Sequence, residues 1–356
     1  MRSITRAGTA LAVGLLLVAI SAAPALACGG LIGPNGAVNL LRTTTFAGYH
    51  AGNEHYVTAF EFAGGGGAFG SLTPLPGVPT SVEKGGDWTL QRLRLETDPR
   101  ERLFALEDAS AAPSAGSAEE LMKVKIDALD ITVLRGGAAE VGQWATDHGF
   151  RLPPDAPEVL DFYATRSPIF LAAAFDADAA AQRGQGIGDG TPVHITIPTD
   201  NPWVPLRILA LGKTGNEQID ADVYLMTDHA PALLPAPTGQ NGLNLDVSQP
   251  ASGSLLADLR SDRGMEWVPD SAWLSKIVIS AAAPKLSFDL AIDASGAGTP
   301  SRVAAGLEAP GTIGDIDTWG PMARWGLGLA FVVIGVGGIA ILLRRRPNDT
   351  GGMTPA

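Results

Sequence analysis

The sequence has a single cysteine, Cys28, so no disulfide bond can form within the chain. Aromatic residues make up only 6% of the chain, which argues against a carbohydrate-binding cleft, because ligand pockets of that kind favour aromatic side chains. Charged residues make up 17% and hydrophobic residues 46%. This balance is typical of a globular protein and not of a disordered one. The stability of the chain must therefore come from a hydrophobic core.

Recognised catalytic motifs are also missing. No Gly-x-Ser-x-Gly motif occurs, so the commonest nucleophile turn of serine hydrolases is absent. The glycine-rich segment at residues 184–190 partly resembles a phosphate-binding loop, but it lacks the lysine and the following helix of such loops. We therefore predict no catalytic residue and no cofactor, and the sequence leaves enzymatic activity open.

The N-terminal segment has the features of a secretory signal peptide. Two arginines lie within the first six residues, and residues 10–20 are apolar but too short to span a bilayer. Small residues then precede the expected cleavage point, so we predict that residues 1–27 are removed. Cys28 would become the first residue of the mature chain, which raises the alternative of an acylated lipoprotein. Against that alternative, Ala25 stands where a lipidation motif favours leucine.

A second hydrophobic run, at residues 325–343, contains no charged residue. At about 1.5 Å per residue a helix of this length covers about 28 Å, close to the hydrocarbon core of a bilayer. Trp325 marks its outer boundary, and Arg344, Arg345 and Arg346 follow directly. Basic clusters stay on the cytoplasmic side. We therefore predict a single-pass protein of the plasma membrane, with its N-terminal part outside and its C-terminus in the cytoplasm.

The exported part of the chain is acidic. The whole chain has 25 Lys and Arg against 37 Asp and Glu. Leaving out Arg2, Arg6, the three tail arginines and Asp349 gives the exported part a net charge of −16. Such a surface repels nucleic acid, so we expect no nucleic-acid partner.

Residues 28–293 are expected to form a mixed α+β region with mainly antiparallel sheet and a few packed helices. Strand-like composition surrounds the turn at residues 51–53, which predicts a hairpin. Asp87 is expected to cap a helix that begins at residue 88. The region divides into two candidate subdomains, residues 28–135 and 136–293, and a Gly/Ala/Pro-rich stalk is predicted at residues 294–324. Further strands are expected at residues 69–75, 122–134, 169–175, 193–197, 204–211, 221–226, 277–280 and 286–292, helices at 138–148, 156–164 and 254–260, and connecting loops at 176–190 and 231–250.

The hairpin carries the one cluster that suggests metal binding. His50 and His55 flank the predicted turn, and Glu54 lies beside them. Histidine and carboxylate groups are common zinc ligands. However, zinc proteases place their two histidines at helical spacing, which this segment does not have. Polar residues at a hairpin tip are the simpler interpretation.

Several segments resemble a bacterial envelope family known as domain of unknown function 2330. The resemblance begins at residues 28–30, directly after the signal peptide, and continues at residues 69–77. It is fullest at residues 144–150, 160–163 and 169–175, and returns at 195–198 and 205–208. Members of the family often have further cysteines near the start, which this chain lacks. The resemblance implies an extracytoplasmic location and no particular activity.

Three functions remain open at this stage. The first is a membrane-anchored binding or scaffolding ectodomain with an unknown envelope partner. The second is an envelope hydrolase that uses the hairpin metal cluster or a pair of carboxylates. The third is a sensor lipoprotein acylated at Cys28.

Overall fold

The structure is a computed structural model, and it describes residues 30–34, 36–37, 43–60, 68–98, 120–182 and 191–311. Its central feature is a seven-stranded sheet in the order β14-β15-β12-β3-β4-β10-β6. Only β12 and β3 pair in parallel, and all other neighbours in this sheet are antiparallel. The strands are β3 (Thr43–His50), β4 (Asn53–Phe60), β6 (Ser81–Lys84), β10 (Thr191–Pro198), β12 (Gln218–Thr227), β14 (Leu243–Pro250) and β15 (Trp273–Ala282).

A second, six-stranded sheet has the order β2-β1-β5-β9-β8-β7 and is antiparallel throughout. Its strands are β1 (Gly30–Gly33), β2 (Gly36–Ala37), β5 (Phe69–Pro74), β7 (Glu120–Ile126), β8 (Leu129–Arg135) and β9 (Ile169–Phe175). A small third sheet consists of β11 (Trp203–Val204), β16 (Leu290–Asp293) and β13 (Ala232–Leu234).

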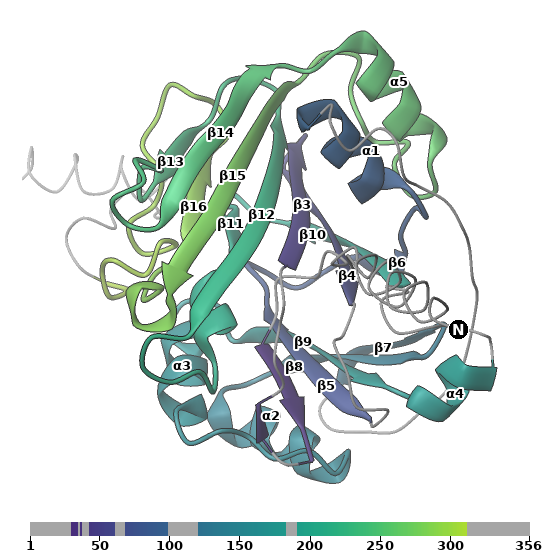
Figure 1. Ribbon diagram of the computed structural model, residues 1–356, viewed down its shortest axis with the longest axis vertical. Helices are drawn as coiled ribbons and strands as arrows, with labels where there is room; N and C mark the ends of the chain where they lie inside the picture. Colours follow the sequence, from purple (N-terminus) through teal and green to yellow (C-terminus); the bar gives the residue numbers. More distant parts are fainter. Residues whose placement is uncertain are drawn as a thin grey trace, which may run out of the picture.

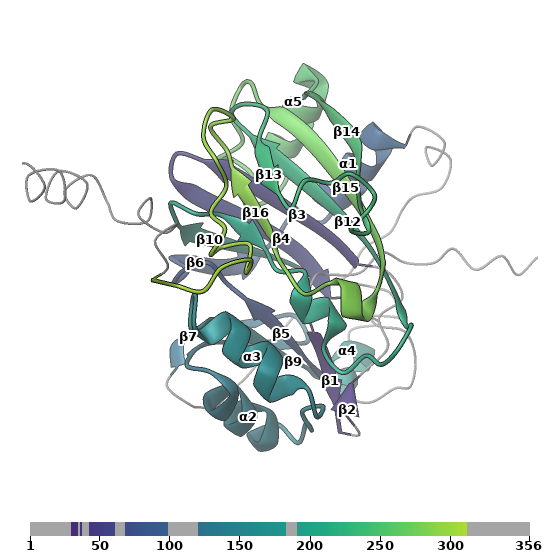
Figure 2. The same cartoon turned by 90° about the vertical axis from the view of Figure 1, so that its left-hand side faces the viewer.

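The helices cover the outer faces of the two large sheets. In Figure 1, α1 and α5 lie against the seven-stranded sheet, whereas α2 and α3 lie on the far side of the six-stranded sheet. Figure 2 shows the same order of layers from another side. The fold is therefore a four-layer α/β/β/α arrangement. The helices are α1 (Thr89–Thr97), α2 (Ala138–Asp147), α3 (Ala156–Ala164), α4 (Ala177–Gln182) and α5 (Gly253–Ser261), with short 3₁₀ helices at Arg207–Ala210 and Ala283–Lys285.

Alternation along the strands divides the apolar side chains among three core clusters. Successive strand residues point to opposite faces of a sheet. On β4, the Tyr56 side chain therefore lies in the core between the sheets, and the Val57 side chain lies in the core beneath α1 and α5. In the same way β9 sends Leu171 to the central core and Phe170 to the core under α2 and α3. Both large sheets thus have apolar clusters on both faces, although β14 at the edge of the seven-stranded sheet is mostly exposed.

Much of the predicted organisation is confirmed. The fold is mixed α+β with mainly antiparallel sheet, and the hairpin of β3 and β4 turns at Ala51 and Gly52, both with positive φ. Residues 122–134 were expected to form one long strand or two in register, and they form two strands, β7 and β8. Helices α2, α3 and α5 and strands β5, β9, β10, β12, β15 and β16 lie where the sequence predicted a helix or a strand.

Four local predictions were wrong. Residues 204–211 were expected to be one strand, but they form the end of β11 and a 3₁₀ helix. The connectors at 231–250 and 176–190 contain β13, β14 and α4. Asp87 does not cap α1. Instead Asp262, from beyond the end of α5, accepts hydrogen bonds from the Trp88 amide (3.2 Å) and the Thr89 hydroxyl (2.7 Å).

The structure also differs from the predicted division into two subdomains and from the predicted start of the stalk. Both large sheets take strands from residues 28–135 and from residues 136–293, so these halves are not separate structural units. The first part of the expected stalk belongs to the folded body. There Ala304 and Ala305 are buried, and the Ala304 carbonyl accepts a hydrogen bond from Arg166.

The predicted membrane segments lie outside the described residues. These are residues 1–27, Cys28, residues 325–343 with Trp325, and Arg344, Arg345 and Arg346. Within the part of the chain that the structure describes, none of the helices has the length and apolar character needed to cross a bilayer.

Candidate functional site

Strand geometry separates the three residues of the predicted metal cluster. Glu54 and His55 are neighbours on β4, so they point to opposite faces of the seven-stranded sheet. Glu54 shares its face with Tyr56 and points toward the central core, whereas His55 shares its face with Val57 and points toward α1 and α5. A single ion cannot be held by both side chains.

His50 lies on the same face as His55, but at the tip of the hairpin. In the register of β3 and β4, His50 pairs with Asn53, and Gly48 pairs with His55, so the two imidazoles are diagonal neighbours. The Nδ1 atom of His50 lies 2.7 Å from Oδ1 of Asp228, which follows β12. Both side chains are partly exposed, so this is a hydrogen bond near the surface.

His55 has a different partner, which sequence reasoning missed. Its Nδ1 atom lies 3.1 Å from Nε2 of His194 on β10, and both imidazoles are buried. One ring nitrogen donates the hydrogen and the other accepts it. The two residues are 139 positions apart in the chain, and their approach depends on the antiparallel pairing of β4 with β10.

Trp267 covers this pair. Its ring stacks on the His55 imidazole with centroids 3.9 Å apart and an interplanar angle of 5°. Gly48 makes the close approach possible, because a Cβ atom there would lie 2.0 Å from the indole. We use the name histidine row for His50, His55 and His194, which run diagonally across β3, β4 and β10 on the face that Trp267 covers.

Burial controls the charge of His55 and His194, the two buried members of the histidine row. Burial, with smaller contributions from nearby His194 and His50, lowers the pKa of His55 to about 3. Burial also lowers the pKa of His194, although Glu83 and Glu266 act in the opposite direction. Oε1 of Glu83 lies 3.8 Å from Nδ1 of His194, too far for a hydrogen bond. The paired imidazoles are therefore neutral at neutral pH.

Glu54, on the other face of β4, is kept neutral for the same reason. Its side chain is completely buried, which raises its pKa to about 8 despite the opposing effect of the Trp203 backbone. Neither carboxyl oxygen meets hydrogen-bond geometry with any group in the described residues. Glu54 is therefore mostly protonated at neutral pH.

The histidine row does not form a metal centre. Across the described parts of the chain, no group of three or more His, Cys, Asp or Glu side chains is arranged to hold an ion. We therefore assign no metal ligand among the residues that the structure describes. What the row offers is a pair of neutral imidazoles that share one hydrogen beneath an aromatic ring.

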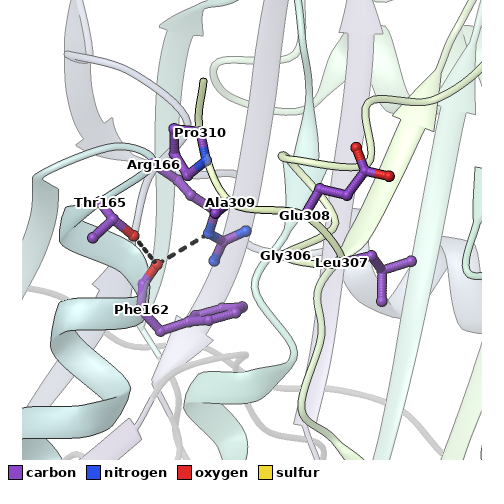
Figure 3. Close-up of a pocket in the computed structure, with 8 residues that line it drawn as sticks. All are labelled: Phe162, Thr165, Arg166, Gly306, Leu307, Glu308, Ala309 and Pro310. Carbon is purple, nitrogen blue, oxygen red and sulfur yellow. Dashed lines mark hydrogen bonds between the residues drawn. The ribbon is translucent and has the colours of Figure 1, made fainter. Parts of the chain in front are cut away.

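A second region lies at the other end of the molecule, where α3 meets residues 306–310. It is a pocket of about 320 Å³ (Figure 3). Figure 3 shows Phe162, Thr165 and Arg166 on one side of it and Gly306, Leu307 and Glu308 on the other, with Pro310 drawn beside Arg166. The lining residues are Phe162, Thr165, Arg166, Gly306, Leu307, Glu308, Ala309 and Pro310.

Arg166 already has protein partners in every direction. Its Nη2 donates to Oδ2 of Asp289 at 2.7 Å, Nη1 donates to the Ala304 carbonyl at 2.6 Å, and Nε donates to the Phe162 carbonyl at 3.1 Å. Its guanidinium also lies 3.8 Å from the centre of the Phe162 ring. These contacts tie α3 to the end of the described chain, so the arginine has a structural role.

Asp289 is the centre of this network and is fully buried. Its Oδ1 accepts hydrogen bonds from the Tyr163 hydroxyl (2.8 Å) and from the amides of Leu206 (2.7 Å) and Arg207 (3.0 Å). The Tyr163 oxygen in turn accepts a hydrogen bond from the Ile208 amide at 2.9 Å. Asp289 thus holds the first turn of the 3₁₀ helix, which explains why residues 204–211 do not continue as a strand.

Comparison with known proteins identifies a family. Residues 23–246 match the model of a family described as an uncharacterised protein conserved in bacteria, DUF2330. The search of curated proteins gave no match.

Among solved structures, a mutated baculovirus P35 after caspase cleavage is 8% identical, with a TM-score of 0.39, and covers 70% of this chain and 99% of its own. The caspase-8/P35 complex is 9% identical with a TM-score of 0.36, covering 70% of this chain and 95% of the other. At these values the similarity supports no inference about function.

Proposed function

The chain belongs to this bacterial DUF2330 family, and we propose that it is a membrane-anchored binding or scaffolding protein of the cell envelope. In this proposal residues 1–27 direct export, and residues 28–324 lie outside the cytoplasm. The segment 325–343 crosses the plasma membrane, and the tail from residue 344 stays inside. The support is the order of hydrophobic and basic segments in the sequence.

The burial of His55 and His194 is the observation that favours binding over catalysis. A catalytic acid or base must come within hydrogen-bond reach of its substrate. His55 and His194 are instead buried beneath Trp267, and Glu54 points into the core between the sheets. The pocket beside α3 contains an arginine whose hydrogen bonds go to protein atoms.

The hydrolase alternative has less support for the same geometric reason. Its metal form requires His50, Glu54 and His55 to converge on one point, but the two faces of β4 separate Glu54 from His55. Its carboxylate form requires two acids on opposite sides of a cleft. The pocket of Figure 3 contains one carboxylate, Glu308, which pairs with Arg302.

The topology can be tested on intact cells. We expect protease added outside to degrade residues 28–324 and to spare an epitope placed after Ala356. Deleting residues 325–356 should release the protein from the membrane. Replacing Arg344, Arg345 and Arg346 with alanine should leave part of the protein inserted in the opposite orientation. Complete protection of the long N-terminal part would refute the proposal. Mass spectrometry of the mature N-terminus tests the acylated alternative, because an unmodified Cys28 excludes it.

The binding role calls for a separate experiment. Val78, Leu245 and Leu307 are the large hydrophobic residues that are exposed among those described. A photo-crosslinking amino acid at each position, in cells, should trap an envelope component from at least one of them. Ala257, an exposed residue of α5, gives the matched control. Absence of crosslinks at all three positions, together with turnover of an envelope substrate by the purified protein, would favour the hydrolase.

A further inference from the structure

The segment Asp262–Asp270 connects α5 to β15 and closes over the outer face of the seven-stranded sheet. Three contacts hold it there. Asp262 binds the start of α1, Gly264 passes over His194, and Trp267 lies flat on His55. A Cβ atom on Gly264 would lie 3.0 Å from Nδ1 of His194, which shows how closely the backbone covers that ring.

Packing, and not hydrogen bonding, holds the Trp267 ring in place, whereas Arg260 donates hydrogen bonds to the carbonyls of Val268 and Pro269 next to it. The Nε1 atom of Trp267 is buried and has no hydrogen-bond partner among the described residues. The ring instead contacts His55 and stacks near Phe46, with centroids 6.1 Å apart. Met265 beside it is fully buried. The stability of the segment in this position therefore depends on the state of the surface beneath it.

That surface is the His55–His194 pair, which is arranged for neutral rings. The rings share one hydrogen across 3.1 Å, so one nitrogen must keep its lone pair. If both rings were charged, no acceptor would remain and two cations would face each other. The rings are only 7% and 3% exposed, so water cannot solvate a charge on them while the segment is closed.

The charged groups around the pair do not stabilise a positive charge on it while the segment is closed. From β3, His50 faces His55 and is hydrogen bonded to Asp228. From β6, Glu83 faces His194, and Glu266 of the segment itself also acts on that ring. The two glutamates favour a proton on His194, but burial outweighs them. The neighbours that act on His55 are His194 and His50, and both oppose a proton there.

We propose that residues 262–270 form an acid-sensitive clasp over the seven-stranded sheet, which opens when the His55–His194 pair takes up protons. Opening hydrates the imidazoles and restores their ordinary affinity for protons, so acid must favour the open form. Below about pH 6.5, each fall of one pH unit raises the equilibrium constant for opening by up to about tenfold for every proton that the pair takes up. The open form exposes Phe46, Met265 and Trp267. The proposal concerns this fold alone and is independent of the membrane topology.

The test measures the exposure of Trp267 in the full-length protein in detergent micelles. Acrylamide quenching of tryptophan fluorescence is recorded from pH 7.5 to pH 4.5, and the curve of Trp267→Phe is subtracted to isolate the Trp267 contribution. We expect quenching of Trp267 to increase below about pH 6.5 while the far-ultraviolet circular dichroism stays native. The control is His229→Gln, which alters an exposed histidine and should leave the increase unchanged.

His194→Gln removes one of the buried bases and should reduce the increase. If that variant does not fold, the ring-proton resonances of the unmodified protein provide the second measurement. The signals of His55 and His194 should then shift below the ordinary imidazole pKa of about 6.5, together with the rise in quenching. Three results would overturn the proposal: constant quenching down to pH 4.5, an unchanged increase in a folded His194→Gln protein, or an increase that coincides with loss of the whole circular dichroism signal.

Discussion

At the scale of single residues, β4 places two uncharged titratable groups on its opposite faces. Glu54 enters the core between the sheets, and His55 enters the layer beneath Trp267. Burial acts on the two groups in opposite directions, because it raises the pKa of the carboxyl group and lowers that of the imidazole. Glu54 therefore contributes a decline in stability toward alkaline pH, and His55 contributes a decline toward acid pH.

Glu54→Gln should remove the alkaline part of this dependence. The pKa of Glu54 rises from its ordinary value of 4.5 to about 8 on folding, so the folded protein keeps a proton that the unfolded chain releases. Stability from this group is complete below pH 4.5 and is lost as the pH rises through 8. Urea unfolding from pH 5 to pH 8 should show a decline of at most about 1.4 kcal/mol per pH unit, which the variant lacks.

The acid side provides an internal reference for that experiment. Stability from His55 is present above its ordinary pKa of 6.5 and is lost as the pH falls toward 3, and this holds for the unmodified protein and the variant alike. Glu83→Gln, on the exposed side chain near His194, is the matched control. If the unmodified protein and Glu54→Gln showed parallel curves of unfolding free energy from pH 5 to pH 8, Glu54 would not be protonated in the folded protein.

Gly48→Ala tests the packing of Trp267. The added methyl group would lie 2.0 Å from the indole, so the ring must move and the free energy of unfolding should fall by about 1–3 kcal/mol. Gly253→Ala is the control, because a Cβ atom there meets nothing within 4 Å. Chemical denaturation of both variants gives the comparison, and equal stabilities would show that Trp267 does not lie over Gly48.

At the scale of secondary structure, local signals predicted the elements that are defined by local contacts. The β3–β4 hairpin, α2 and α3 follow from turn composition, helical periodicity and stop signals. By contrast, β14 was missed because six of its eight residues are exposed, so its polar sequence resembles a connector. The His55–His194 pair was missed because no local pattern brings residues 139 positions apart together.

The start of α1 is the clearest case of a distant residue replacing a local one. The sequence predicted Asp87 as the cap, but α1 has no side-chain cap, and Asp262 instead accepts hydrogen bonds from the Trp88 amide and the Thr89 hydroxyl. Asp262→Asn should therefore lower the free energy of unfolding by about 1–2 kcal/mol, because it weakens the buried acceptor of these two hydrogen bonds. Asp87→Asn should change it by less than about 0.5 kcal/mol. A larger effect at Asp87 than at Asp262 in urea titrations would support the original prediction.

At the scale of the whole molecule, the Arg166–Asp289 pair joins α3, the 3₁₀ helix and the C-terminal end of the described chain. Its side chains are 4% and 0% exposed. Asp289→Asn should lower the free energy of unfolding by about 3–5 kcal/mol, because the guanidinium is left buried without its counter-charge. Asp270→Asn breaks a pair with Arg260 in which the aspartate is fully exposed, and should change stability by less than about 1 kcal/mol. Similar thermal midpoints for the two variants would contradict this assignment.

The order of strands in the seven-stranded sheet has a consequence for how the protein matures. β3 obtains its parallel neighbour β12 only after more than half of the chain has been made, and β12 in turn needs β15. A chain made from its N-terminus would therefore have the hairpin of β3 and β4 with the long side of β3 unpaired until β12 is complete. Its early segments would benefit during that interval from chaperones that shield unpaired strands.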